Sequence, residues 1–283
     1  MQENLQGYHT DRLEAVSFYV CITCGTQFSP SAEPPAACLI CDDDRQYVGL
    51  DGQKWTTVDE LRQDHENEFI PMEAGVTAIL TKPSFAIGQR AFLIESPGGN
   101  VLWDCLTLLD RNTIGFIREG GGLAAVAISH PHYYSAMVDW AEEFHVPVYL
   151  HAADRQWVMR ESPRLQFWEG ETRPLHDGFT LIRAGGHFEG GTVLHCPASA
   201  GGRGALFSGD IIQVVLDRRW VSFMYSYPNL IPLSAREVRR IVATVEPFSF
   251  DRIYGAFHPR QVQADGKNVI RRSAERYIQY LTK

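Results

Sequence analysis

The 283-residue sequence has no apolar run of the roughly 18 residues that a membrane-spanning helix needs. It also lacks long blocks of basic residues, and its formal net charge of −8 argues against binding to a nucleic-acid backbone. Residues 1–20 do not show the basic start and apolar centre of a signal peptide. We therefore expect a soluble cytoplasmic protein that binds neither membranes nor nucleic acids.

Cysteine is scarce, yet four of the six cysteines form two CxxC pairs, Cys21 with Cys24 and Cys38 with Cys41. Without an export signal we expect these thiols to hold a metal ion rather than to form disulfides. The segment between the pairs is rich in Ser, Pro and Ala and cannot form a hydrophobic core, so metal binding would supply the folding free energy. The spacing predicts a zinc ribbon in which all four sulfurs bind one zinc ion.

An iron site of the rubredoxin type is the alternative, because CITCG resembles the first knuckle of rubredoxin, although CLICD lacks the corresponding glycine. A four-sulfur site has no open position for a substrate. We therefore expect the cysteine module to be structural or to form a docking surface for a protein partner. Assembly of the chain into a homo-oligomer also stays open.

The rest of the chain alternates between extended and helical patterns. Thr57 and Glu60 have capping-box spacing and predict a short helix after the cysteine module. Apolar runs bounded by Gly and Pro predict strands in VTAILTK, FAIGQRAFLIES, NVLWDCLTLL, GLAAVAIS, VPVYLHA, FTLIRAGG, GTVLHCP, GALFSGD and FDRIYGAF. Apolar residues at helical spacing predict helices in YYSAMVDWAEEF, SAREVRRIVATV and NVIRRSAERYIQYL.

Because the strands outnumber the helices and occur in runs, they favour a layered α/β protein with two sheets over a doubly wound parallel sheet. The predicted domains are an N-terminal segment with the cysteine module at residues 1–55, a linker helix at 56–75 and an α/β domain at 76–283.

Potential metal ligands follow several of the predicted strands. His130 and His132 lie two residues apart on a segment expected to be extended, where their side chains would point the same way. His187 lies in a glycine-rich turn between two strands, and Asp210 and His258 each end a strand. The ends of strands are where α/β folds gather their chemistry, so these five residues are candidate ligands.

The order of these segments resembles the metallo-β-lactamase-fold hydrolase superfamily. GNVLWDC resembles its early strand that ends in Asp, and SHPHYYS stands where the family has HxHxDH. GGHFEGGTVL resembles the glycine-flanked third histidine, LFSGD the bridging aspartate and GAFH the final histidine. The resemblance runs from about residue 76 to 260 and implies an αββα sandwich with its site at one edge of the two sheets.

Carried over to this sequence, the resemblance implies that His130, His132 and His187 form a first metal site that Asp210 bridges or completes. His258 would belong to a second site, and Asp104 would be a carboxylate that steadies a ligand histidine. The sequence departs from the family at Tyr134 and Ser135, where the Asp and His of the second site are expected. Their side chains are poor replacements, so we expect one metal ion, zinc or iron, on the histidines.

Three imidazoles and one open position are typical of catalytic zinc, which lowers the pKa of bound water to about 7. The predicted function is therefore hydrolysis of a small ester, thioester or lactone. Asp210 would be the general base and His258 the proton donor to the leaving group. Tyr134 either donates a hydrogen bond to a developing oxyanion or packs as an aromatic filler.

The segment after Asp210, LDRRWVSFMYSYPNL, is expected to form the substrate wall, through Arg218, Arg219, Phe223 and Tyr225. Its residue types suggest a small, partly apolar substrate that carries an anionic group. Two alternative functions stay open. One is a mononuclear non-haem iron oxygenase of the persulfide-dioxygenase type, since two histidines and Asp210 can form a facial triad. The other is a non-catalytic scaffold that docks a partner through the zinc ribbon.

Overall fold

Two β-sheets packed face to face form the centre of the protein, which a computed structural model describes for residues 16–283. The first sheet has seven strands, in the spatial order β3 (Glu66–Glu73), β4 (Val76–Lys82), β5 (Arg90–Ile94), β6 (Val101–Trp103), β7 (Ala125–Ala127), β8 (Val148–His151) and β9 (Leu165–Trp168). The second has six, in the order β10 (Thr172–Pro174), β11 (Thr180–Arg183), β12 (Thr192–Cys196), β13 (Ala205–Gly209), β18 (Arg252–Gly255) and β19 (Gln261–Val262).

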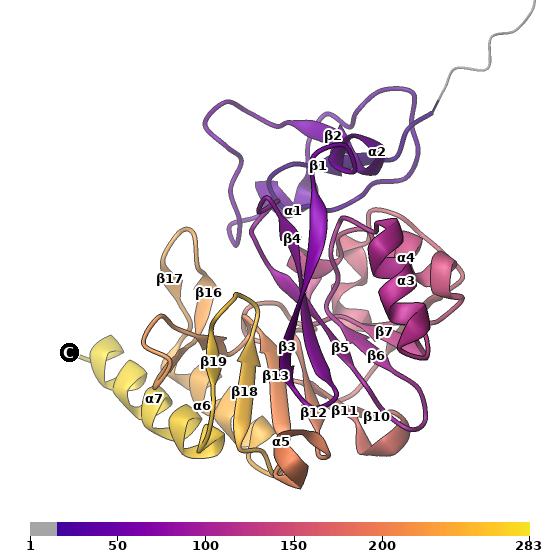
Figure 1. The fold of residues 1–283 in the computed structure, drawn as a ribbon. Coiled ribbons are helices and arrows are strands. Elements are labelled where there is room, and N and C mark those ends of the chain that lie inside the picture. The colour runs from indigo at the N-terminus through magenta and orange to yellow at the C-terminus, as the bar shows by residue number, and fades with distance from the viewer. Residues whose placement is uncertain (1–15) are drawn as a thin grey trace, which may run out of the picture.

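Helices cover the outer face of each sheet (Figure 1). Those on the first sheet are α3 (Arg111–Glu119) and α4 (Met137–Phe144), and those on the second are α6 (Ala235–Val245) and α7 (Gly266–Leu281). In α6, Ser234 accepts a hydrogen bond from the Glu237 N–H at the start of the helix, and Val238 and Ile241 are buried against the sheet. This order of layers confirms the expected αββα sandwich.

The interior between the sheets is largely aromatic. Phe92 of β5 meets Phe207 of β13 with ring centroids 5.2 Å apart, and Phe207 stacks on Tyr254 of β18 at 4.9 Å. Trp103 of β6 belongs to the same cluster and is fully buried. Such close packing fixes the two sheets against each other and so fixes the relative positions of the strand ends that carry the site.

Four neighbouring strands of the first sheet and two of the second run parallel, which gathers their carboxyl ends at one edge. Pairs β6–β7, β7–β8 and β8–β9 are parallel in the first sheet, and β13–β18 is the parallel pair of the second. Asp104 and Ser129 therefore follow neighbouring strands of one sheet, while Asp210 follows a strand of the other. Residues far apart in the sequence meet where the two sheets face each other.

Short elements connect these layers. They are α5 (Ser199–Gly202), the 3₁₀ turns η1 (Pro131–Tyr133), η2 (Ala152–Trp157) and η3 (His176–Gly178), and the small strands β14 (Gln213–Val214), β15 (Val221–Ser222), β16 (Met224–Ser226) and β17 (Ile231–Pro232). β14 pairs with β15 and β16 with β17 as antiparallel hairpins. No helix within residues 16–283 is long and apolar enough to cross a membrane.

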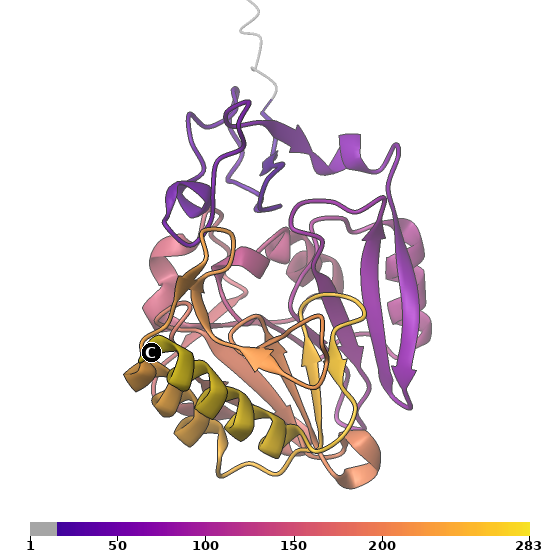
Figure 2. The same cartoon turned by 90° about the vertical axis from the view of Figure 1, so that its left-hand side faces the viewer.

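The cysteine module lies across one end of the two sheets, as both views show (Figures 1 and 2). Its two strands, β1 (Tyr19–Cys21) and β2 (Trp55–Thr57), pair antiparallel, and the one-turn helix α1 (Leu39–Asp42) lies between them in the sequence. A small N-terminal module around four clustered cysteines was expected and is confirmed, and the structure shows that it is built on a two-stranded sheet.

The predicted linker helix is wrong beyond its first turn. Thr57 and Glu60 form a complete capping box at the start of α2 (Val58–Leu61), but the next residues form β3. This strand pairs with β4 along its length and lies at the edge of the first sheet, where Pro71 is tolerated because it need not donate to a further strand. Residues 66–73 therefore belong to the large domain.

The side chain of Asn67 connects this edge strand to its surroundings by three hydrogen bonds. Its side chain donates to the Leu108 carbonyl at 3.0 Å and to Thr113 Oγ1 at 2.9 Å, and it accepts from Thr81 Oγ1 at 2.8 Å. Asn67→Ala is expected to lower the free energy of unfolding by roughly 1–3 kcal/mol, because it leaves buried polar groups unpaired. Urea unfolding measures this change. Glu68→Ala, at an exposed position of the same strand, is the control, and equal effects of the two substitutions would contradict the role of Asn67.

Candidate metal centres and pocket

The four cysteines of the N-terminal module converge on one point. Cys21 Sγ lies 3.6 Å from Cys41 Sγ, and Cys24 Sγ lies 3.6 Å from Cys38 Sγ. Four sulfurs bound tetrahedrally to zinc lie about 3.8 Å apart, so the cluster matches the size of such a site. Contacts with the neighbouring cysteines, chiefly Cys21, together with burial raise the pKa of Cys24 well above its ordinary value. A cation at the centre would remove this penalty on the thiolate form.

The cysteine module is attached to the large domain on both sides. The Gln27 N–H donates to the Ser135 carbonyl at 3.0 Å, and the Ser29 N–H donates to the Met159 carbonyl at 3.0 Å. On the other side, Asn229 of the β16–β17 hairpin donates to the Asp44 and Gln46 carbonyls at 2.8 and 2.9 Å. The segment after α1 is therefore held against the large domain.

His130, His132, His187 and Asp210 form a second buried cluster, in which one donor atom of each lies within 4.8 Å of the others. His130 follows β7 and begins the turn η1, which contains His132, while His187 lies in the turn between β11 and β12. Asp210 directly follows β13. The predicted extended geometry of the two neighbouring histidines is wrong, because Pro131 starts a 3₁₀ turn, but the turn still brings both imidazoles to the cluster.

The atoms that face each other in this cluster are imidazole nitrogens and a carboxylate oxygen. His187 donates its Nδ1–H to the Tyr225 carbonyl at 2.6 Å, which leaves Nε2 as a lone pair in the neutral ring. That Nε2 lies 3.2 Å from His132 Nδ1 and 3.9 Å from Asp210 Oδ1. His130 Nε2 lies 3.0 Å from Asp210 Oδ1, yet neither atom has a partner with hydrogen-bond geometry.

These distances fit one metal ion. Zinc binds nitrogen and oxygen at about 2.0–2.2 Å, which places tetrahedral ligand atoms about 3.3 Å apart. Burial lowers the pKa of His130 and His132 well below the ordinary value and that of His187 to about 4. All three imidazoles are therefore neutral at pH 7, which is the form that binds metals. Among residues 16–283 this and the cysteine cluster are the two groups with suitable ligand geometry.

Asp104 supports the first histidine through its neighbour. It accepts a hydrogen bond from the Ser129 N–H at 2.8 Å, and Ser129 Oγ lies 3.0 Å from His130 Nδ1. Burial raises the pKa of Asp104 to about 7. Gly209 makes room for this chain, because a Cβ there would lie 2.7 Å from Ser129 Oγ and its φ is +53°. Asp104 was predicted to support a ligand histidine, and it does so indirectly, because Ser129 lies between Asp104 and His130.

A pocket of about 320 Å³ opens beside the cluster and is lined by His132, His187 and Asp210. The large domain adds Ala86, Ile87, Gln213, Tyr227, Pro228 and Phe257, and the cysteine module adds Arg45, Gln46 and Tyr47. Tyr227 donates to the Asp210 carbonyl at 2.8 Å and so fixes the backbone of this residue. The volume suits a small ligand.

Tyr134 and His258 do not reach the cluster. Tyr134 packs in the layer between the first sheet and α4, and its hydroxyl faces the Asp154 carbonyl at 3.5 Å. Of the two roles considered for Tyr134, the structure supports the packed aromatic residue, and the predicted role as an oxyanion donor is wrong. His258 is exposed because the chain turns after β18, so that Phe257 enters the pocket in its place. Its predicted roles in metal binding and proton donation are not supported.

The predicted substrate wall is only partly at the pocket. Arg218 and Arg219 line a separate surface hollow with Gln261 and Arg272, and Phe223 is fully buried in the core under α6 and α7. The hairpins after Asp210 turn the chain away, which explains these errors. Tyr225 does lie at the site, through its carbonyl bond to His187.

Three residues at the site were not predicted. Tyr133 packs 4.6 Å from the His130 ring, and burial together with the charge of Asp210 raises its pKa well above the ordinary value. Arg45 and Gln46 come from the segment DDDRQY, whose composition gives no signal of a site. Only the adjacency of Tyr133 to His132 offered a hint.

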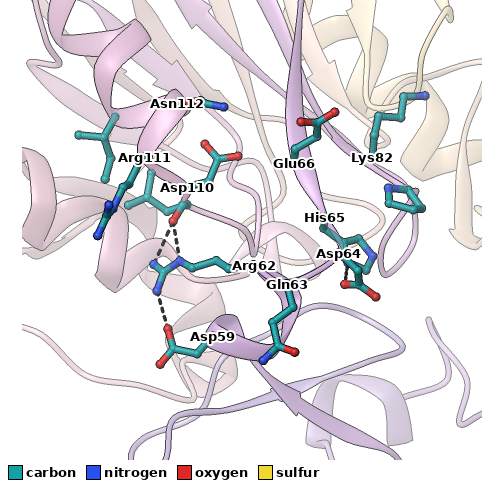
Figure 3. A pocket seen from close by; sticks show the side chains of 13 residues that line it. Asp59, Arg62, Gln63, Asp64, His65, Glu66, Lys82, Asp110, Arg111 and Asn112 are labelled. Atoms are coloured by element: carbon teal, nitrogen blue, oxygen red, sulfur yellow. Dashed lines mark hydrogen bonds and ion pairs between the residues drawn. The ribbon is translucent and has the colours of Figure 1, made fainter.

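A larger hollow lies elsewhere on the described part of the chain, between α2, β3 and the start of α3 (Figure 3). Several of its charged groups make structural contacts. Arg62 pairs with Asp59 and donates to the Leu109 carbonyl, and Asp110 accepts from the Thr113 N–H at the start of α3. His65 pairs with Asp64. The chemistry is therefore assigned to the smaller pocket beside the histidines.

Comparisons with known proteins agree with this geometry. Residues 86–256 match the family described as Metallo-beta-lactamase superfamily. The uncharacterized protein YmaE of Bacillus subtilis (strain 168) is 50% identical over 266 residues, which cover 93% of this chain and 97% of YmaE.

Solved structures show the same fold at low identity. The DIM-1 metallo-beta-lactamase has a TM-score of 0.57 at 15% identity and covers 76% of this chain and 98% of its own. FIM-1 from Pseudomonas aeruginosa, in its mono-zinc form, has a TM-score of 0.55 at 14% identity and covers 74% and 95%.

The two clusters predict two metal ions per chain. Cys38→Ser with Cys41→Ser and, separately, His130→Ala with His187→Ala should each reduce the content to one ion, because each pair removes half of a four-ligand site. Elemental analysis after identical dialysis measures the content. Retention of two ions by the histidine variant would contradict the second site, and three ions in the parent protein would require ligands outside both clusters.

Proposed function

Since the chain belongs to the metallo-beta-lactamase superfamily, we propose that its histidine–aspartate cluster holds one zinc ion and hydrolyses a small ester, thioester or lactone. The observation that carries this proposal is the convergence of four buried donor atoms beside a pocket of about 320 Å³. Zinc bound there supplies a Lewis acid that lowers the pKa of water to about 7. Three imidazoles favour zinc over the iron of a facial triad, which uses two.

Asp210 is the proposed general base. Its carboxylate lines the pocket, and Oδ1 is the oxygen that faces the histidines and would bind the metal, which leaves Oδ2 to accept a proton from the attacking water. The same carboxylate can return the proton to the leaving group, which replaces the role predicted for His258. The Tyr133 hydroxyl is buried without a hydrogen-bond partner among the described residues, and we propose that it orients the Asp210 carboxylate, while Tyr227 holds the backbone of Asp210.

Substitutions of Asp210 and of the adjacent tyrosines Tyr133 and Tyr134 distinguish this mechanism from the one predicted from the sequence, in which Tyr134 takes part. Asp210→Ala is expected to lower kcat about 100-fold or more, as expected for loss of a general base, and Tyr133→Phe about tenfold through misorientation of Asp210. Tyr134→Phe is the matched control and should leave kcat near the parent value, because its hydroxyl faces away from the pocket. The measurement is turnover of p-nitrophenyl acetate, an acyl thioester and a γ-lactone by zinc-loaded protein.

Full activity in Asp210→Ala would exclude its role as base. A parent protein that turns over none of the three substrates would contradict the proposed hydrolase. Oxygen consumption by iron-loaded protein with a persulfide would instead support the oxygenase alternative.

A further inference from the structure

The cysteine module contributes a positively charged group to the pocket of the large domain. Among the pocket residues Arg45 is the one with a guanidinium or ammonium group, and its side chain is only 12% exposed. Its Nη1 lies 3.4 Å from the carbonyl of His187, one of the proposed metal ligands. A residue of the module therefore lies next to the centre of the other domain.

Arg45 is held in one position by its neighbours. Asp43 accepts from Arg45 Nε at 2.5 Å and from Nη2 at 2.8 Å, and Phe188 lies under the guanidinium with its ring centroid 3.9 Å from Cζ. The Phe188 ring in turn packs at about 5 Å against all three histidines. Burial works against the charge on Arg45, but its bonds to Asp43 raise its pKa above the ordinary value.

Two polar groups remain for a ligand. Asp43 occupies one edge of the guanidinium, and Nη1 donates one N–H to the His187 carbonyl at 3.4 Å, which leaves its second N–H for a ligand. Gln46, which is 4% exposed, lines the same pocket, and its Nε2 can donate a further hydrogen bond to a ligand.

The rest of the lining suits an apolar linker. Ala86, Ile87, Pro228 and Phe257 line the pocket together with these polar groups. A ligand that occupies the pocket between the metal centre and Arg45 therefore contacts apolar surface as well as donors. A carboxylate is the group that a guanidinium and an amide bind together.

We propose that Arg45 and Gln46 form a carboxylate subsite, so that the substrate is a small ester, thioester or lactone with a carboxylate at its far end. This inference rests on the proposed function for the reaction, but the binding of the acid does not depend on turnover. The cysteine cluster lies close to the subsite along the chain, because Arg45 follows Cys41 by only four residues, and Asn229 holds the residues on either side of Arg45.

The chain contains a matched control for Arg45. Arg219 makes the same contact with the aspartate two residues before it, with Nε and Nη2 both 2.8 Å from the Asp217 oxygens, but it lies on the surface with 80% of its side chain exposed. It lines a different hollow from the histidine pocket. Arg219→Ala thus removes the same local ion pair without touching the proposed subsite.

Titration calorimetry with glutarate on zinc-loaded protein tests the subsite directly. Arg45→Ala is expected to raise the Kd of glutarate about 10- to 100-fold, as expected for loss of hydrogen bonds to a charged group, and Gln46→Ala to raise it less. Arg219→Ala should leave the Kd unchanged. Metal content and thermal unfolding establish that each variant is folded, and Arg45→Lys, which keeps the charge, should restore part of the binding.

Kinetics with a pair of esters provides the second readout. The parent should prefer p-nitrophenyl hydrogen glutarate over p-nitrophenyl butyrate, and Arg45→Ala should lose this preference about 10- to 100-fold in kcat/KM. Arg45-dependent binding of glutarate in a protein that hydrolyses neither ester would contradict the hydrolase and leave the subsite supported. If the protein hydrolyses an ester but does not bind glutarate, or binds it equally well in Arg45→Ala, the subsite alone would be overturned.

Discussion

The arrangement of the protein depends on four buried donor atoms that face each other. His130, His132, His187 and Asp210 bring lone pairs and a carboxylate to within a few ångströms, at a place where burial removes water. Without a cation such a cluster costs free energy, since a buried carboxylate needs an opposite charge and buried acceptors need donors. A metal ion satisfies all four together. Metal binding would therefore stabilise the folded protein as well as supply its chemistry.

The two sheets are built so that this cluster can form. The parallel pairs β6–β7 and β13–β18 bring strand ends from each sheet to a common edge, and the aromatic layer between the sheets fixes their distance. Ser129 and Asp104 then hold the backbone before His130, with Gly209 allowing the close approach of the second sheet. The histidines lie in turns that follow these strands, and Asp210 directly follows β13, so the two sheets position all four ligands.

The cysteine module is part of the same site, not a separate domain. Gln27 and Ser29 bond to the large domain, and the residues after α1 form a wall of the pocket. The module also carries exposed apolar side chains, among them Phe18, Leu39 and Leu50, so the scaffold alternative stays open. Arg45 of the pocket follows Cys41 by only four residues, so the cysteine cluster lies close to the pocket along the chain.

Much of the fold could be predicted from the sequence, because strands such as VTAILTK and helices such as SAREVRRIVATV show clear periodicity. The ligand histidines followed from their order along the chain. The helix α3 was missed, since Gly115 and polar residues interrupt its pattern, and β3 was taken for helix because its edge position leaves it polar on one face. Tyr133 and Tyr134 could not be told apart, because a 3₁₀ turn changes the direction of each successive side chain. Arg45 was beyond prediction, since only tertiary docking brings it to the site.

X-ray absorption at the zinc and iron K edges tests the central claim most directly. The cluster predicts a nitrogen and oxygen shell at about 2.0–2.1 Å, in addition to a sulfur shell at about 2.3 Å from the cysteine site. The shorter shell should disappear in His130→Ala with His187→Ala while the sulfur shell remains. A spectrum of metal-saturated parent protein with sulfur ligands alone would contradict the account.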